Sequence, residues 1–125
     1  MKAQKERKIL VVEDDEDLLC LYRLYLQGGS YKILQAKNGK EGLELAEREK
    51  PDLIILDMIM PVMDGEEFIQ KFRLEGKNFD IPIIIASVND KIPPVLVEKG
   101  RIQSVLKKPF PIETLLKEID SILGG

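Results

Sequence analysis

The chain has 125 residues, a formal net charge of -3, 44% hydrophobic and 33% charged residues, one cysteine and no histidine. This length and balance favour one soluble globular domain over a disordered or membrane protein, and the net charge gives nucleic acid no electrostatic attraction. The lack of histidine excludes imidazole acid-base catalysis, Ser-His and Cys-His nucleophiles, and zinc sites with imidazole ligands.

The N-terminal residues and the single cysteine indicate where the protein works. Residues 1–7 are polar and basic, and we expect them to form a flexible lead. No long apolar stretch follows them, so we predict neither export nor membrane insertion. Cys20 stands among leucines, which favours a packing role, and one cysteine forms no internal disulfide. These features together predict a cytoplasmic protein.

Strand-like runs alternate with helical patterns through the first half of the chain. Residues 8–12 predict a strand, and a helix should begin near residue 17 and end at Gly28-Gly29. Apolar residues at helical spacing give that helix its expected buried face: Leu18, Leu21, Tyr22, Tyr25 and Leu26. Residues 31–36 predict a second strand. Asn38-Gly39 then turns the chain into a helix over residues 40–49.

The second half begins with a nearly continuous apolar run over residues 52–57, which is typical of a strand covered on both faces. Asp64 is placed to cap the next helix, with Glu67 in capping-box position and a buried stripe of Phe68, Ile69 and Phe72. Residues 81–87 and 104–108 predict two more strands, and residues 111–123 predict a final amphipathic helix.

The segment between the last two strands departs from this regular pattern. Pro93 and Pro94 fit only the first turn of a helix, which leaves one or two turns before Gly100. We therefore expect a short or irregular fourth helix. The whole pattern predicts an α/β protein with a five-stranded parallel sheet and helices on both faces. In such open sheets the functional crevice lies outside the carboxyl ends of the strands.

Charged and hydroxyl side chains follow the expected strand ends. These residues are Glu13, Asp14 and Asp15 after the first strand, Asp57 after the third, Ser87 at the end of the fourth, and Lys107 and Lys108 at the end of the fifth. Two carboxylates about 4 Å apart repel by roughly 4 kcal/mol at an effective dielectric constant of 20, so the cluster needs a cation. Carboxylate oxygens are ligands that Mg²⁺ accepts while it keeps waters for a phosphate.

The same positions favour phosphoryl chemistry over nucleotide binding. The first strand-to-helix turn is acidic rather than glycine-rich, and neither G-x-G-x-x-G nor a Walker lysine motif is present, so a flavin or dinucleotide cofactor is not expected. A carboxylate beside Mg²⁺ and a lysine can attack phosphorus and form an acyl phosphate. Lys108 and Ser87 could then neutralise phosphoryl oxygens together with Mg²⁺.

Four motifs resemble landmarks of one family in the family's own order: "ILVVEDD", "PDLIILDMIMPVMDG", "IPIIIAS" and "KKPF". Through them the chain resembles the receiver domain of two-component response regulators over nearly its whole length. The resemblance implies a single receiver domain over residues 1–125, with a flavodoxin-like three-layer fold and strand order 2-1-3-4-5. The strand order comes from the resemblance and not from the pattern of elements.

The resemblance also implies a role for each site residue. Asp57 would be the phosphoacceptor, and Glu13 and Asp14 the acidic pair, with Asp14 the more direct Mg²⁺ ligand. The backbone carbonyl of Ile59 would bind the same ion. Ser87 stands where the family has serine or threonine.

Lys108 precedes a proline, Pro109, through a bond that is usually cis in the family. The implied phosphodonor is a phosphohistidine on a sensor histidine kinase or histidine phosphotransfer protein. The signal would pass to a downstream protein partner or a fused output domain. The domain would not be an enzyme beyond self-catalysed phosphotransfer to Asp57 and slow autodephosphorylation.

Two other classes of function compete with this interpretation. Many receivers carry an aromatic at the position of Val105 and a small residue at that of Val88, so a receiver-like module that binds partners without phosphorylation is an alternative. The valine at 105 also predicts a changed signalling route. An aspartyl phosphatase similar to haloacid dehalogenases would need a second aspartate two residues after Asp57, where this chain has Ile59. Taken alone, Asp14, Asp15 or Asp17 could simply cap a helix.

Overall fold

The structure is a computed structural model that describes residues 6–27, 31–75 and 80–124. Its five strands form one parallel sheet in the order β2-β1-β3-β4-β5, as expected. The strands are β1 (Arg7–Val12), β2 (Tyr31–Ala36), β3 (Leu53–Leu56), β4 (Ile83–Ser87) and β5 (Ile102–Lys107). The helices are α1 (Glu16–Leu26), α2 (Gly39–Glu49), α3 (Gly65–Ile69), α4 (Pro94–Lys99) and α5 (Ile112–Leu123). A π-helical turn, η1 (Gln70–Leu74), continues α3.

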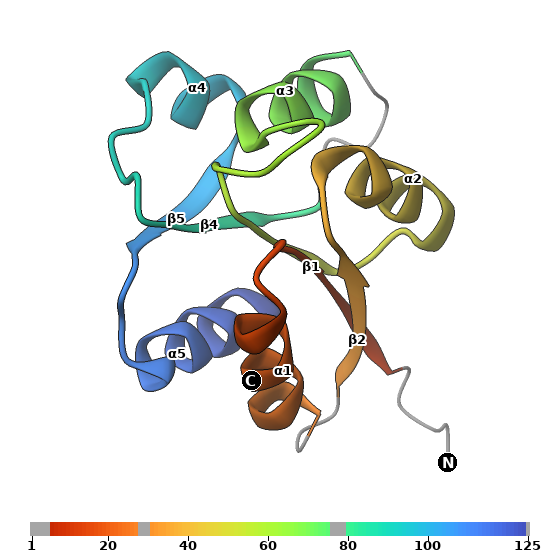
Figure 1. Cartoon of the computed structure of the whole chain (residues 1–125), viewed down its shortest axis with the longest axis vertical. Helices are drawn as coiled ribbons and strands as arrows, with labels where there is room; N and C mark the ends of the chain where they lie inside the picture. Colours follow the sequence, from red (N-terminus) through yellow and green to blue (C-terminus); the bar gives the residue numbers. More distant parts are fainter. Residues whose placement is uncertain (1–5, 28–30, 76–79, 125) are drawn as a thin grey trace.

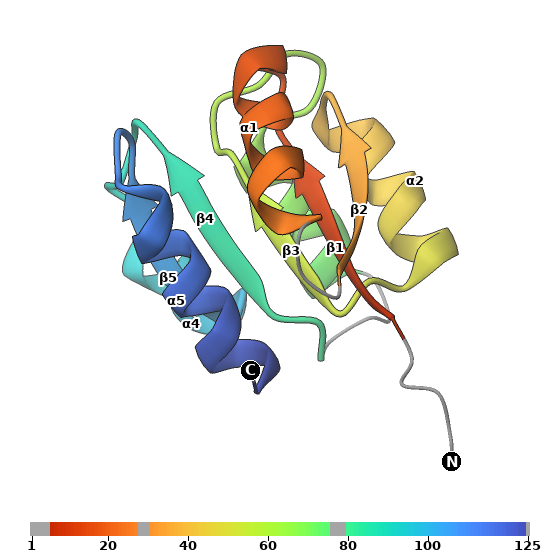
Figure 2. The same ribbon diagram turned by 90° about the horizontal axis from the view of Figure 1, so that it is seen from below.

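The elements form three layers, with α1 and α5 on one face of the sheet and α2, α3 and α4 on the other (Figure 1, Figure 2). All residues of β3 and β4 are buried. Along β3, Ile54 and Leu56 pack into the cluster on the α2–α4 side, while Leu53 and Ile55 pack into the cluster on the α1–α5 side. Alternating side chains therefore serve two cores, which explains why the apolar run of β3 is continuous.

Capping side chains set where the helices begin. The Asp15 carboxylate accepts hydrogen bonds from the Asp17 and Leu18 amides, so α1 begins at Glu16. Asn38 accepts from the Glu41 amide and starts α2. The cap predicted at Asp64 is confirmed, since its carboxylate accepts from the Glu67 amide at 2.9 Å.

The predicted buried face of α1 is partly wrong. The helix buries Leu19, Tyr22 and Leu26, whereas Leu21 and Tyr25 are 41% and 48% exposed. Cys20 is also exposed, which contradicts its predicted packing role. Apolar residues surround most of this helix, so spacing alone fits two different faces. The predicted stripe of Phe68, Ile69 and Phe72 is confirmed as buried.

The remaining boundaries differ little from the expected ones. Helix α4 has 6 residues, which confirms that it is short. Strand β5 begins at Ile102, two residues before the expected position, and α2 begins at Gly39 rather than residue 40. Arg7, expected in the basic lead, is instead the first residue of β1. Residues 1–5 of that lead and Gly28-Gly29 lie outside the described residues.

A buried arginine joins η1 to two neighbouring segments. Arg73 is 3% exposed, and its Nε donates a hydrogen bond to the Gly100 carbonyl at 2.8 Å. Its Nη2 donates to the Ile81 carbonyl. The Arg73 guanidinium also lies over the Phe72 ring. One side chain therefore fixes η1 to the turn after α4 and to the segment before β4.

Replacing Arg73 with leucine should lower the free energy of unfolding by about 2 kcal/mol, because buried carbonyl oxygens lose charged donors. Arg48→Leu is the matched control, since the Arg48 side chain is exposed and, among the described residues, its one ion pair is with Glu49; its effect should stay below about 0.5 kcal/mol. Urea unfolding of the three proteins measures both values. Equal effects for the two variants would contradict the role given to Arg73.

Candidate functional site

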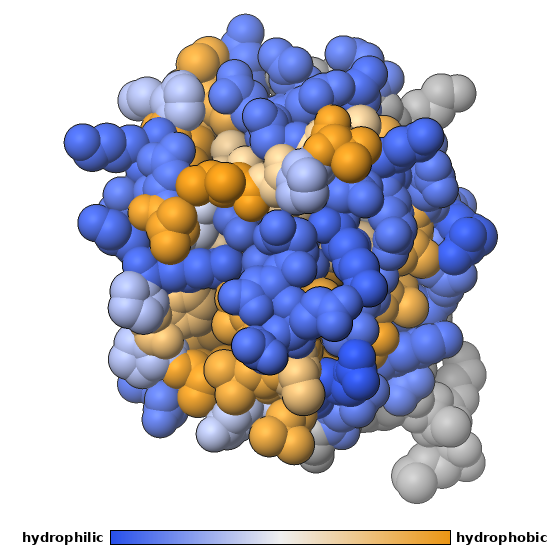
Figure 3. Space-filling model, in the orientation of Figure 1, coloured by the Kyte–Doolittle hydropathy of each residue, from blue (hydrophilic) through white to orange (hydrophobic). Residues whose placement is uncertain are grey.

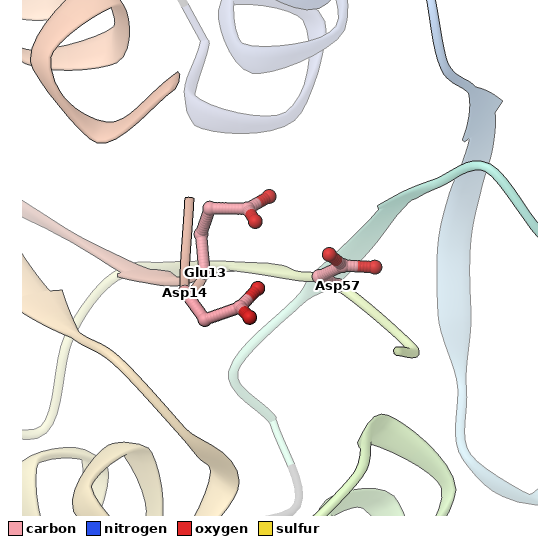
Figure 4. Close-up of side chains that lie close together, drawn as sticks. All are labelled: Glu13, Asp14 and Asp57. Atoms are coloured by element: carbon pink, nitrogen blue, oxygen red, sulfur yellow. The ribbon is translucent and has the colours of Figure 1, made fainter. Parts of the chain in front are cut away.

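Two acidic residues emerge side by side because β1 and β3 are paired in parallel. Val12 and Leu56 are register partners, so Glu13 and Asp57 follow at the same edge of the sheet. The Asp57 amide donates to the Val12 carbonyl at 3.0 Å. Figure 4 shows Glu13 and Asp14 extending from the end of β1 toward Asp57. One carboxylate oxygen from each of these three residues lies within 4.8 Å of the other two.

A lysine lies between the two buried acids. Glu13 and Asp57 are only 2% and 6% exposed. Lys108 Nζ donates to Glu13 Oε1 at 2.5 Å and to Asp57 Oδ2 at 3.2 Å. The Lys108 amide also donates to the Ser87 carbonyl, and the Lys108–Pro109 peptide is cis, as expected. The ammonium group of Lys108, directly after β5, therefore lies between two carboxylates that follow two other strands.

Backbone amides hold the other carboxylate oxygens. Glu13 Oε2 accepts from the Asp15 amide, and Asp57 Oδ1 accepts from the Ile59 amide, both at 3.1 Å. These amide donors fix the orientation of each carboxylate. The sequence analysis did not predict them, because a pattern of side chains does not reveal backbone hydrogen bonds. The Asp15 carboxylate is itself turned to the amides that begin α1, so it acts as a helix cap.

The turn after Asp57 requires a glycine at position 65. A Cβ atom there would lie 2.7 Å from the Asp57 carbonyl oxygen and 2.6 Å from Met58 Sδ. The Gly65 amide donates to the Met58 carbonyl at 3.1 Å. The start of α3 can therefore approach the phosphoacceptor candidate only because Gly65 lacks a side chain.

Burial and like charge together perturb the acids. Burial raises the pKa of Glu13 to about 7, and the negative charge of Asp57 adds to this, while hydrogen bonds from Lys108 and the Asp15 amide oppose it. For Lys108 burial alone would lower the pKa, but its hydrogen bond to Glu13 and the charges of Glu13 and Asp57 raise it overall. The side chain of Lys108 therefore stays protonated at this position.

The other predicted site residues occupy the same edge. Ser87 is the last residue of β4 and fully buried, and its hydroxyl accepts from the Asn89 amide at 3.3 Å. Ile59 is 53% exposed beside Asp57. Val105 is half-buried against the core on the α2–α4 side, and Val88 is 58% exposed.

The sequence predicted Tyr22 only as a residue of the buried face of α1, but its hydroxyl also lies near the acidic site. Its hydroxyl is buried and has no hydrogen-bond partner among the described residues. Burial raises the pKa of Tyr22, and the charges of Glu13 and Asp57 raise it further. The residue therefore stays a neutral phenol near the acids, a feature that the helical spacing of α1 could not reveal.

The donor set suits a hard divalent cation. Glu13 and Asp57 present buried oxygens, and Asp14 is exposed, so an ion held by all three would remain open to solvent on one side. Oxygen ligands with an open side are the arrangement in which Mg²⁺ meets phosphate groups. No helix among the described residues is long and apolar enough to cross a membrane.

The fold and the residues at this edge of the sheet define a class of open α/β proteins in which carboxylates and a lysine lie together at the carboxyl ends of the strands. The family model described as the response regulator receiver domain matches residues 9–120. The chain therefore belongs to the receiver domains of response regulators, as its four motifs predicted.

The named relatives differ in the share of their own length that this chain covers. Protein PilH of Pseudomonas aeruginosa is 31% identical over 119 residues, which span 94% of this chain and 98% of PilH. The alkaline phosphatase synthesis transcriptional regulatory protein PhoP of Bacillus subtilis is 32% identical over 94% of this chain, but only 48% of PhoP is covered. The chain thus matches the whole of one relative and about half of the other.

Solved structures agree with the family assignment. Chemotaxis protein CheY4 of Vibrio cholerae has a TM-score of 0.80 at 30% identity, with 94% of this chain and 99% of that chain covered. The response regulator TrrA of Thermotoga maritima, solved in complex with Mg²⁺-BeF, has a TM-score of 0.81 at 26% identity, with 93% and 98% covered. The predicted receiver fold is confirmed.

Lys108→Met should destabilise the metal-free protein, because it leaves Glu13 and Asp57 facing each other without a cation. We expect a loss of about 1 to 3 kcal/mol at pH 8 in EDTA. Lys107→Met is the matched control, since Lys107 precedes Lys108 and its side chain is exposed. Urea unfolding should show no comparable loss for the control; a loss of the same size would contradict the role of Lys108.

Proposed function

We propose that the chain accepts a phosphoryl group on Asp57, in a Mg²⁺-dependent reaction, from a phosphohistidine on a sensor histidine kinase or histidine phosphotransfer protein. The observation that carries this proposal is the placement of Asp57. It is a buried carboxylate at the end of a central strand, with one oxygen fixed by the Ile59 amide and the other facing Lys108. Such a carboxylate is oriented before any donor arrives.

Glu13, Asp14 and Asp57 would hold the Mg²⁺ ion, together with the backbone carbonyl of Ile59 that the family resemblance adds. The clustering of the three carboxylates supports this set. When bound, the ion supplies positive charge to the phosphoryl oxygens of the donor. Its charge would also offset the repulsion between the Glu13 and Asp57 carboxylates, which adds to the effect of burial on the pKa of Glu13.

In the transfer, an Asp57 oxygen attacks phosphorus as the bond to the donor's histidine nitrogen breaks, and that nitrogen keeps the bonding electron pair. The product is an acyl phosphate on Asp57. Lys108, whose ammonium already contacts Asp57 Oδ2, would neutralise one phosphoryl oxygen, and the Ser87 hydroxyl would donate to another. No side chain of this protein needs to remove a proton in that step.

Asp57 is consumed as an acceptor, so the chain is not a turnover enzyme beyond this self-catalysed transfer and slow autodephosphorylation. We infer that it works in the cytoplasm and signals by altered binding of a downstream protein partner or a fused output domain. The net charge of -3 gives no support to direct binding of nucleic acid.

A receiver-shaped module that works without phosphorylation is the second candidate. Val105 favours it, because a half-buried valine cannot make the aromatic rotation that links many phosphorylation sites to their output face. The short helix α4 leaves the same face less regular. A direct phosphorylation assay separates the two candidates, since only the first requires Asp57 to accept a phosphoryl group.

Incubation with acetyl phosphate and Mg²⁺ should add one phosphoryl group to the protein, as seen in the intact mass. The addition should disappear in Asp57→Asn and in EDTA, because both remove part of the site. Asp120→Asn, an exposed acid on α5, is the matched control and should be phosphorylated like the unchanged protein. If no mass is added and rapid turnover of acetyl phosphate is also excluded, the second candidate replaces the first.

A further inference from the structure

A strained turn lies in the loop that joins β3 to α3, a few residues after Asp57. Val62 has a φ of 70°, and the Met63 amide donates to the Pro61 carbonyl at 2.7 Å. A three-residue turn with this hydrogen bond and a positive φ at its centre is the rare form of the γ-turn, and a β-branched residue fits it poorly. Forming this turn therefore costs free energy.

Burial of the central side chain does not offset that cost. Val62 is 77% exposed. Figure 3, in the orientation of Figure 1, shows hydrophobic side chains at the surface over the loop between β3 and α3. A strained backbone persists only where the surrounding structure enforces it. A neighbouring contact must therefore hold the turn in place.

That contact comes from the first residue of α2. The Gly39 amide donates to the Met63 carbonyl at 3.0 Å. An amide in the first turn of a helix has no acceptor within the helix, so it can donate to another segment. Among the described residues, this is the one backbone–backbone hydrogen bond that joins residues 58–64 to an element other than β3 and α3. The Met63 side chain, 9% exposed, packs into the core on the same side of the sheet.

Glycine is required at position 39 for this contact. A Cβ atom there would lie 2.5 Å from the Met63 carbonyl oxygen and 2.8 Å from Met63 Cγ. The nearer of these atoms belongs to the backbone, so it can move away only if the loop itself moves. Asn38, whose side chain accepts from the Glu41 amide, fixes the start of α2 at this place. A larger residue at position 39 would therefore displace the loop.

The same loop carries backbone groups of the acidic site. The Ile59 amide donates to Asp57 Oδ1 at 3.1 Å. The Ile59 carbonyl is the backbone ligand in the proposed Mg²⁺ set. A displacement of the loop at Met63 would change the orientation of both Ile59 groups. The residue at position 39 therefore affects the site although its own atoms contact neither carboxylate nor ion.

We propose that Gly39 is a positioning residue of the phosphoacceptor site, because its contact with Met63 holds the loop after Asp57 in the strained form that binds Mg²⁺. This inference rests on the proposed function, since it concerns the same Mg²⁺ site. The coupling acts in both directions: the Gly39–Met63 contact favours Mg²⁺ binding, and Mg²⁺ binding favours the contact.

Calorimetric titration with Mg²⁺ tests the role of Gly39. Gly39→Ala should raise the Kd for Mg²⁺ by roughly tenfold, the scale of a typical coupling between two sites. Gly100→Ala, in the turn after α4, is the matched control, because its Cβ would also lie 2.5 Å from a backbone carbonyl oxygen, that of Leu96. Urea unfolding in EDTA should show a loss of stability in both variants, whereas the Kd of Gly100→Ala should equal that of the unchanged protein. Equal Kd values for all three proteins, or equal rises in both variants, would overturn the proposal.

Amide hydrogen exchange gives a second readout that needs no glycine variant to fold, since exchange reports the local opening of a hydrogen bond. In the unchanged protein Mg²⁺ should slow exchange at the Gly39 amide more than at the Gly100 amide, which donates to the Leu96 carbonyl at 2.7 Å. Asp57→Asn should show no such difference. Equal slowing at both amides would contradict the role of Gly39 and leave the proposed function intact. No Mg²⁺ binding by the unchanged protein would overturn both together.

Discussion

The site depends on one ammonium group placed between two buried carboxylates. Glu13 and Asp57 emerge from neighbouring parallel strands, so the sheet register that builds the core also forces like charges together. Lys108 contacts both and is the only cation that does so among the described residues. Its position follows from the end of β5, and with Asp14 at the same edge three carboxylates face this one lysine. Burial is the main cause of the raised pKa of Glu13, and the charge of Asp57 adds to it. A divalent ion would complete the balance.

The backbone around Asp57 is shaped to keep its carboxylate in place. Gly65 lets α3 start against the Asp57 carbonyl, and the Ile59 amide holds one carboxylate oxygen. Between them Val62 has a φ of 70°, a left-handed conformation that is unfavourable for a β-branched residue, and its side chain is 77% exposed. Strain of this kind persists where the surroundings enforce it and is common beside functional sites.

The sequence predicted the sheet and the residues at its carboxyl edge, because continuous apolar runs mark the central strands and parallel strands end together. Helix α1 was harder, since apolar residues occur on most of its circumference; the predicted face included Leu21 and missed Leu19, and Cys20 proved exposed. The amide donors of Asp15 and Ile59 and the buried Tyr22 hydroxyl carry no sequence pattern at all. The roles of Asp57, Ser87 and Lys108 in phosphoryl transfer stay predictions, as does the changed signalling route at Val105.

The most direct test of the central claim is urea unfolding of the unchanged protein and of Asp57→Asn, each in EDTA and in Mg²⁺. If buried like charges create the metal site, Asp57→Asn should be more stable than the unchanged protein in EDTA. Mg²⁺ at about a hundred times its Kd should then stabilise the unchanged protein by about 3 kcal/mol and the variant far less. Equal stabilisation of both proteins by Mg²⁺ would contradict the account.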